Sequence, residues 1–236
     1  MKRHVKLAPG EYYHIYNRGV EKRIVFTDKS DYDRFLLLLS ICNQRVSINV
    51  RDFKIKLSLG STSGKEGKND TDSLVDIGAY CLMPNHFHIL IKEKDDNGIT
   101  EFMRKITTAY TMYFNKKYKR VGPLFQGSFK SEYIDSDKYL KYLFSYINLN
   151  PIKLIQLDWK EEGIKDINHA QNFLKEYNYS SYLEYKNDRN LPHGILRKAS
   201  FPEYFLSEKD FDNEILDWLN YSSLGPTSGE SYPQEN

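Results

Sequence analysis

Two histidines separated by one residue, His86 and His88, form the densest chemical signal in this sequence. They stand in the string Asn85-His86-Phe87-His88, at the start of a run with the pattern of a β-strand. Residues two apart on a strand project from the same face, so the two imidazoles would lie side by side while Phe87 points into the core. Imidazole binds Zn, Mn, Ni, Cu or Fe, and two ligands leave positions open for a substrate oxygen. The chain has six histidines, so this spacing alone fits ordinary hydrogen bonding equally well.

A helix expected over residues 137–150 carries two further polar side chains at the edge of its apolar face. Tyr146 and Asn150 are four residues apart, which places them one turn apart on the same side of the helix. A tyrosine there can pack its ring and still direct its hydroxyl into a polar cleft, and an asparagine carbonyl is a hard metal ligand. However, most of the 19 tyrosines must be packing residues, and an asparagine before Pro151 is a common helix end. Both interpretations stay open at this point.

The histidine and tyrosine segments stand among several motifs whose order is more specific than the histidine pair alone. The two main strings are YCLMPNHFHIL at residues 80–90 and YINLNP at residues 146–151. Together they resemble the HUH single-tyrosine transposases, specifically the REP-associated branch, over about residues 10–185. The supporting strings are YNRG at 16–19, DYDRFL at 31–36, GPLFQG at 122–127, FKS at 129–131 and YSSY at 179–182.

The resemblance implies a DNA nickase and strand transferase that acts on single-stranded DNA with hairpins. In that family's mechanism His86, His88 and Asn150 would bind Mg²⁺ or Mn²⁺, and Tyr146 would be the nucleophile. Attack by the tyrosine gives a 5′-phosphotyrosine, and the energy kept in that bond lets a second 3′-OH rejoin strands without ATP. The sequence identifies no base for the phenol proton. Relatives include monomers and homodimers, and the resemblance leaves both open.

Positive charge is concentrated in the first two thirds of the chain. The net charge is +2, but residues 1–158 have a balance of +8 and residues 159–236 a balance of −6. A basic first part suits a polyanion such as DNA. Many relatives have an arginine where this chain has Ser128, and Lys130 is expected to replace that phosphate contact. The basic residues expected to contact DNA are Arg18, Lys22, Arg23, Arg104, Lys105, Lys116, Lys117, Lys119, Arg120 and Lys130.

The elements that must position these residues are helices interleaved with strands. Strand patterns occur at residues 12–17, 52–59, 74–82, 87–92 and 129–134. Helix patterns occur at residues 31–39, 99–118 and 137–150. The turn at residues 83–85 predicts that its flanking strands pair as a hairpin. This order favours an α+β, ferredoxin-like sandwich with a mostly antiparallel sheet and helices on one face, and the resemblance implies the HUH endonuclease type.

Three segments are expected along the chain. Residues 1–158 would form the catalytic domain, residues 159–223 an acidic, partly helical extension with a helix over 207–219, and residues 224–236 a disordered tail. A glycine-rich stretch at residues 60–65 resembles a phosphate-binding loop, but its spacing is wrong and a linker is the better interpretation.

Composition excludes several other classes of protein. No apolar run approaches the length of a membrane span, and no secretory signal is present, so we expect a cytoplasmic protein without a membrane partner. Cys42 and Cys81 stand in apolar stretches and are expected to be buried, reduced thiols. His14, on the first strand, is interpreted as a packing residue.

Two other functions remain as alternatives to a tyrosine transposase. The first is a catalytically idle protein that binds DNA hairpins and regulates, although the intact His86, His88, Tyr146 and Asn150 argue against it. The second is a metal-dependent phosphoesterase in which water attacks instead of tyrosine. A covalent protein–DNA adduct separates the transposase from both.

Overall fold

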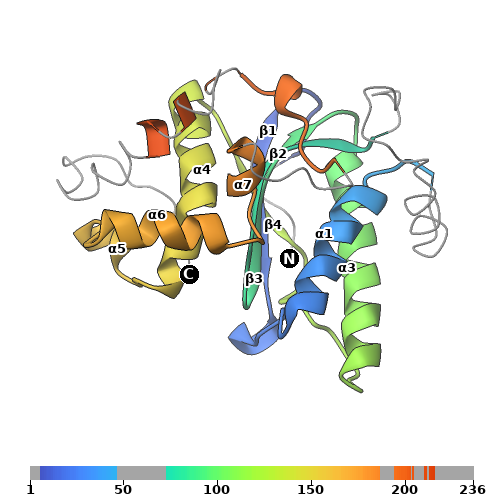
Figure 1. The fold of residues 1–236 in the computed structure, drawn as a ribbon. Helices are drawn as coiled ribbons and strands as arrows, with labels where there is room; N and C mark the ends of the chain where they lie inside the picture. The colour runs from blue at the N-terminus through green and yellow to red at the C-terminus, as the bar shows by residue number, and fades with distance from the viewer. Residues whose placement is uncertain are drawn as a thin grey trace, which may run out of the picture.

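A four-stranded antiparallel sheet forms the centre of the computed structural model (Figure 1). The structure describes residues 6–46, 73–186, 194–202, 204, 210–211 and 213–215. The strand expected at 52–59 and the linker at 60–65 lie outside these residues. The α+β class with a mostly antiparallel sheet is confirmed. In spatial order the strands are β2 (Val75–Met83), β3 (His86–Glu93), β1 (Tyr12–Arg18) and β4 (Lys130–Tyr133).

The predicted hairpin between β2 and β3 is present and turns at Pro84 and Asn85. The carbonyl oxygen of Pro84 accepts hydrogen bonds from the backbone amides of Val25 and Phe26, at 2.8 and 3.0 Å. The Asn85 carbonyl accepts from the amide of Gly19 at 2.8 Å. These bonds attach the turn to the segment that follows β1, which includes the short 3-10 helix η1 (Val20–Lys22). The beginning of β3 is therefore fixed from two sides.

Helices α1 (Lys29–Ile41) and α3 (Gly98–Lys117) cover one face of the sheet (Figure 1). Asp28 caps α1, where its side chain and that of Asp31 form a capping box. The ring of Phe35 lies between Phe87 and Tyr110, with its centroid 5.1 Å from each. Phe87 thus points into this core, as the sequence predicts, and the strand pleat sends its neighbours to the opposite face.

Helices also cover the opposite face, which corrects the expectation of helices on one face only. Helix α4 (Asp137–Leu149) begins after Ser136, whose side chain accepts a hydrogen bond from the Tyr139 amide, and it packs on β2 and β3. All nine residues of β2 are buried. A strand between two helical layers has no solvent face, so its sequence is almost continuously apolar instead of alternating.

The described chain beyond residue 158 packs into the same second core. Its helices are α5 (Trp159–Glu162), α6 (Ile167–Glu176), α7 (Tyr182–Tyr185) and the 3-10 helix η4 (Lys198–Ser200). The Leu82 amide donates a hydrogen bond to the Tyr179 carbonyl oxygen, and the Ser181 amide donates to the Tyr80 carbonyl oxygen, each at 2.9 Å. The predicted boundary at 158 stays a prediction, but the extension shares its core with α4 and the sheet.

Residues 210–211 and 213–215, within the helix expected at 207–219, are helical, and Phe211 and Ile215 lie in this second core. Cys42 and Cys81 are buried free thiols, as expected. None of the helices in the described ranges is long and apolar enough to cross a membrane.

Candidate active site

His86 and His88 lie on the face of β3 that packs against α4. Their ring centroids are 4.9 Å apart and the rings are nearly perpendicular. The Nδ1 atom of His86 is 2.6 Å from Oδ1 of Asn85, whose Nδ2 donates to the carbonyl oxygen of Lys22 at 3.3 Å. That second bond orients the amide, so Asn85 Oδ1 accepts from a proton on His86 Nδ1. The lone pair of His86 is therefore on Nε2, the atom that can bind a metal.

Tyr146 lies against these histidines in the same chain. Its ring centroid is 5.8 Å from that of His88 in an edge-on arrangement, and the side chain is 6% exposed. Tyr142, one turn earlier on α4, stacks on it at 5.9 Å. The Nζ atom of Lys160, at the start of α5, lies 4.0 Å from the centroid of the Tyr146 ring. The predicted nucleophile and histidines are thus brought together without a second subunit.

Asn150 follows α4 as the first residue of the 3-10 helix η3 (Asn150–Leu154). Its side chain is fully buried, and neither its Oδ1 nor its Nδ2 has a hydrogen-bond partner. A buried amide without partners costs about 1–3 kcal/mol, which a simple helix end does not require. This cost is explained if the amide oxygen serves a ligand.

The two histidines fit a divalent cation if Asn150 supplies a third donor. No group of three His, Cys, Asp or Glu side chains in the described part of the chain could hold a metal. Two imidazoles therefore need a different third donor, and the amide oxygen of Asn150 is of the right chemical type. Such a set leaves coordination positions for a substrate.

Two residues that the sequence analysis did not place in the site, His14 and Glu132, extend the polar face next to His88. Nε2 of His14 is 2.9 Å from Nδ1 of His88, and Nδ1 of His14 is 3.6 Å from Oε2 of Glu132. The Tyr16 hydroxyl donates to Glu132 at 2.6 Å. Burial acts to raise the pKa of Glu132, but its contacts with His14 and Tyr16 outweigh burial and lower it. The alternating pattern of the first strand includes His14, which could therefore be considered from the sequence, whereas no local sequence pattern marks Glu132.

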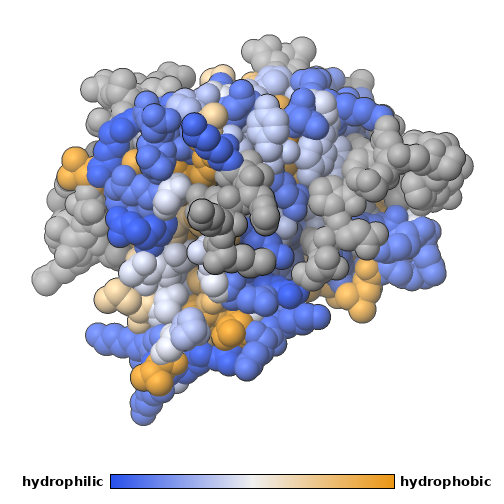
Figure 2. All heavy atoms as spheres, turned by 180° about the vertical axis from the view of Figure 1, so that it is seen from behind, coloured by the Kyte–Doolittle hydropathy of each residue, from blue (hydrophilic) through white to orange (hydrophobic). Residues whose placement is uncertain are grey.

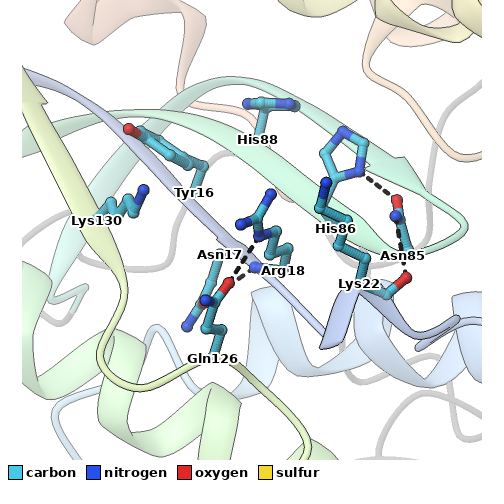
Figure 3. Close-up of a pocket in the computed structure, with 9 residues that line it drawn as sticks. All are labelled: Tyr16, Asn17, Arg18, Lys22, Asn85, His86, His88, Gln126 and Lys130. Atoms are coloured by element: carbon cyan, nitrogen blue, oxygen red, sulfur yellow. Dashed lines mark hydrogen bonds between the residues drawn. The ribbon is translucent and has the colours of Figure 1, made fainter. Parts of the chain in front are cut away.

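A pocket of about 220 Å³ opens beside the two histidines (Figure 3). Three of the basic residues expected to bind DNA, Arg18, Lys22 and Lys130, lie around it. Nε of Arg18 donates to the Gln126 side chain at 2.7 Å, which holds the guanidinium at the rim. The pocket is lined by Tyr16, Asn17, Arg18, Lys22, Asn85, His86, His88, Gln126 and Lys130.

The segment that holds these residues matches a known family. Residues 67–150 match the family model described as "Transposase IS200 like". The match includes His86, His88, Tyr146 and Asn150, and it confirms the resemblance to transposases. It supports a role of this chain in DNA transposition.

Comparison with solved structures gives low similarity scores for this chain. The structure titled as a REP-associated tyrosine transposase bound to a REP hairpin has a TM-score of 0.43 and 16% identity, over 82% of this chain and 89% of that chain. A bacterial tRNA(His) guanylyltransferase-like protein with ATP has a TM-score of 0.36 and 10% identity, over 74% and 71%. The tRNA(His) guanylyltransferase of Saccharomyces cerevisiae has 0.34 and 14%, over 73% and 74%. Curated proteins gave no significant match.

Several other basic residues of the chain that were expected to bind DNA form contacts within the protein. Lys117 pairs with Asp28 and Asp31 at 2.7 Å each; desolvation acts to lower the pKa of Lys117, but the hydrogen bonds with these carboxylates outweigh it and raise the pKa. Lys105 donates to the Gln44 and Arg45 carbonyl oxygens at 2.8 and 3.2 Å. Arg23 pairs with Glu21, and Arg120 donates a hydrogen bond to the Asn115 side chain. The other expected DNA contacts, which are all exposed, are Arg104, Lys116 and Lys119.

The described surface seen from behind is mainly hydrophilic, and its apolar residues form small, separate groups (Figure 2).

Proposed function

We propose that this protein nicks and rejoins single-stranded DNA through Tyr146, with Mg²⁺ or Mn²⁺ held by His86, His88 and Asn150. The observation that carries the proposal is the edge contact between the Tyr146 ring and His88, with His86 alongside, inside the segment matched to the transposase family. A nucleophile next to a metal-binding pair is the arrangement that phosphoryl transfer requires.

The reaction balances as a displacement at one phosphodiester. The phenol of Tyr146 loses its proton and its oxygen forms a bond to phosphorus, while the bond from phosphorus to the 3′ oxygen breaks. One strand end leaves with a 3′-OH, and the other remains joined to the protein as a 5′-phosphotyrosine. A bound divalent cation would polarise the scissile phosphate. Attack by a different 3′-OH reverses the step and joins new ends.

The substrate we propose is single-stranded DNA that folds into hairpins. This choice follows the sequence resemblance to the REP-associated branch, and the pocket chemistry supports a nucleic acid. Arg18, Lys22 and Lys130 line the same pocket as the histidines, so phosphates next to the scissile bond would meet positive charge there. Because Tyr146 contacts its own chain's histidine, one protomer is enough for the chemistry, and a monomer is proposed as the acting unit.

The pocket lysines should contribute to DNA affinity, whereas a lysine engaged elsewhere should not. Lys130→Gln is expected to weaken binding of a single-stranded hairpin and to reduce the salt slope of the binding constant by about 0.7 to 1, as loss of one phosphate contact does. Fluorescence anisotropy at several salt concentrations measures this slope. Lys105→Gln is the control, and an equal change in both variants would contradict the assignment of Lys130 to the pocket.

The proposal is tested by formation of a covalent adduct. Wild-type protein is incubated with Mn²⁺ and single-stranded oligonucleotides copied from palindromes that flank its gene, then run on a denaturing gel. We expect a band shifted by the attached DNA, absent with EDTA, and a phosphopeptide that mass spectrometry assigns to Tyr146. Cleaved DNA without an adduct would favour the phosphoesterase, and tight binding without cleavage would favour the regulatory binder.

A further inference from the structure

We propose that Glu132 and His14 are positioning residues that select the tautomer of His88, and so direct the lone pair on its Nε2 toward the metal. This inference rests on the proposed metal site. It assigns a role to two side chains on strands other than the one that carries the histidine pair.

The three side chains form a row across neighbouring strands. In the sheet β1 lies between β3 and β4, and His14 on β1 is directly opposite Glu132 on β4. On its other side, His14 is paired with Leu90 and lies diagonal to His88, with 2.9 Å between His14 Nε2 and His88 Nδ1. The two rings are stacked with centroids 5.0 Å apart. His14 and His88 are 6% and 1% exposed, so solvent competes little for their ring nitrogens.

The 2.9 Å contact between the two imidazoles has only two neutral arrangements. If His14 carries its proton on Nε2, it donates to His88 Nδ1, and His88 must then carry its own proton on Nε2, where it blocks metal binding. If His14 carries its proton on Nδ1, its Nε2 accepts from His88 Nδ1–H, and the lone pair of His88 is on Nε2. Only the second arrangement makes His88 a ligand through that atom.

Glu132 favours the second arrangement. Its Oε2 is 3.6 Å from His14 Nδ1, longer than a normal hydrogen bond but close enough for a carboxylate to favour a proton on the facing nitrogen. Hydroxyl groups of Tyr16 and Tyr139 donate to the same carboxylate at 2.6 and 3.4 Å, which holds it in place as an acceptor. Carboxylate partners of metal-binding histidines act in this way, and their loss typically weakens metal binding 10- to 100-fold.

The test compares the full-length wild-type protein with Glu132→Gln in the absence of DNA. Mn²⁺ titration followed by electron paramagnetic resonance should show an affinity about 10- to 100-fold lower in the variant. Long-range ¹H–¹⁵N spectra of the metal-free protein, with the His88 signals assigned from a His88→Gln sample, should show an Nδ1–H tautomer in the wild type. The Nε2–H form should gain population in Glu132→Gln.

Glu11→Gln is the matched control, because Glu11 also accepts a hydrogen bond from a tyrosine hydroxyl, that of Tyr133 at 2.9 Å, but pairs with no histidine in the described part of the chain. It should keep both the Mn²⁺ affinity and the His88 tautomer. Unchanged affinity and unchanged tautomer in Glu132→Gln would overturn the inference, as would a loss of affinity with the tautomer unchanged. A wild-type protein that binds no Mn²⁺ would instead overturn the proposed metal site itself.

Discussion

Tyr146→Phe should abolish the covalent protein–DNA adduct while DNA affinity stays within about twofold of the wild type. The substitution removes only the hydroxyl oxygen, which is the atom proposed to bond to phosphorus, and it leaves the ring against His88 and Tyr142. Loss of a nucleophile typically costs at least a thousandfold in rate. A denaturing gel with Mn²⁺ measures the adduct, and anisotropy with the same oligonucleotide measures binding.

Tyr142→Phe is the matched control, since it removes a hydroxyl from the neighbouring ring of the same helix face. This variant should still form the adduct, which shows that loss of a tyrosine hydroxyl on α4 does not by itself stop the reaction. An adduct formed by Tyr146→Phe would refute the assignment of the nucleophile. Strand cleavage that continues in that variant without an adduct would show that water attacks the phosphate.

Asn150→Leu should make the protein more stable and at the same time inactive. The amide of Asn150 is fully buried with no hydrogen-bond partner at either polar atom. An apolar side chain of similar size therefore removes the cost of burying an amide that has lost its hydrogen bonds to water. We expect the free energy of unfolding to rise by about 1 kcal/mol. The same change removes the third proposed metal ligand, and Mn²⁺ affinity should fall at least about tenfold together with adduct formation. Urea unfolding without metal measures the free energy of unfolding, and Mn²⁺ titration measures the metal affinity.

Asn148→Leu provides the contrast two residues earlier. The side chain of Asn148 is equally buried but donates to the Phe144 carbonyl oxygen at 2.9 Å and accepts from the Ser181 hydroxyl at 2.8 Å. Its replacement should destabilise the protein by about 1–3 kcal/mol, because both hydrogen bonds of the amide are lost and the Ser181 hydroxyl keeps only its longer bond to the Tyr80 carbonyl oxygen, at 3.3 Å. If Asn150→Leu is destabilising to the same extent, Asn150 is a structural residue, and the metal site needs another third ligand.

The sequence by itself determined the local parts of this site. A spacing of two on a strand places His86 and His88 on one face, and a spacing of four on a helix places Tyr146 and Asn150 on one side, because these periods follow from backbone geometry alone. The hairpin at Pro84 and Asn85 was predictable for the same reason. The order of motifs then indicated a resemblance to transposases, and residues 67–150 match the family model described as "Transposase IS200 like".

Only the tertiary structure decided which elements become neighbours. His14 meets His88 across 74 residues of sequence because β1 pairs with β3, and it faces Glu132 because β1 also pairs with β4. Strand periodicity reports which face a residue takes but not which strand lies beside it. The helical layer on the second face was missed for a similar reason, since an apolar arc on α4 shows that the helix packs but not on which side of the sheet it packs.

The sequence also could not show which lysines are engaged within the protein and which lie at the pocket. In the sequence Lys105, Lys117 and Lys130 are equivalent positive charges, each compatible with a phosphate contact. The folded chain gives Lys105 two backbone carbonyl oxygens, gives Lys117 two aspartates and leaves Lys130 at the pocket beside the histidines. A charge binds whichever opposite charge or dipole the fold brings within reach, and that distance is set by contacts between segments far apart in the chain.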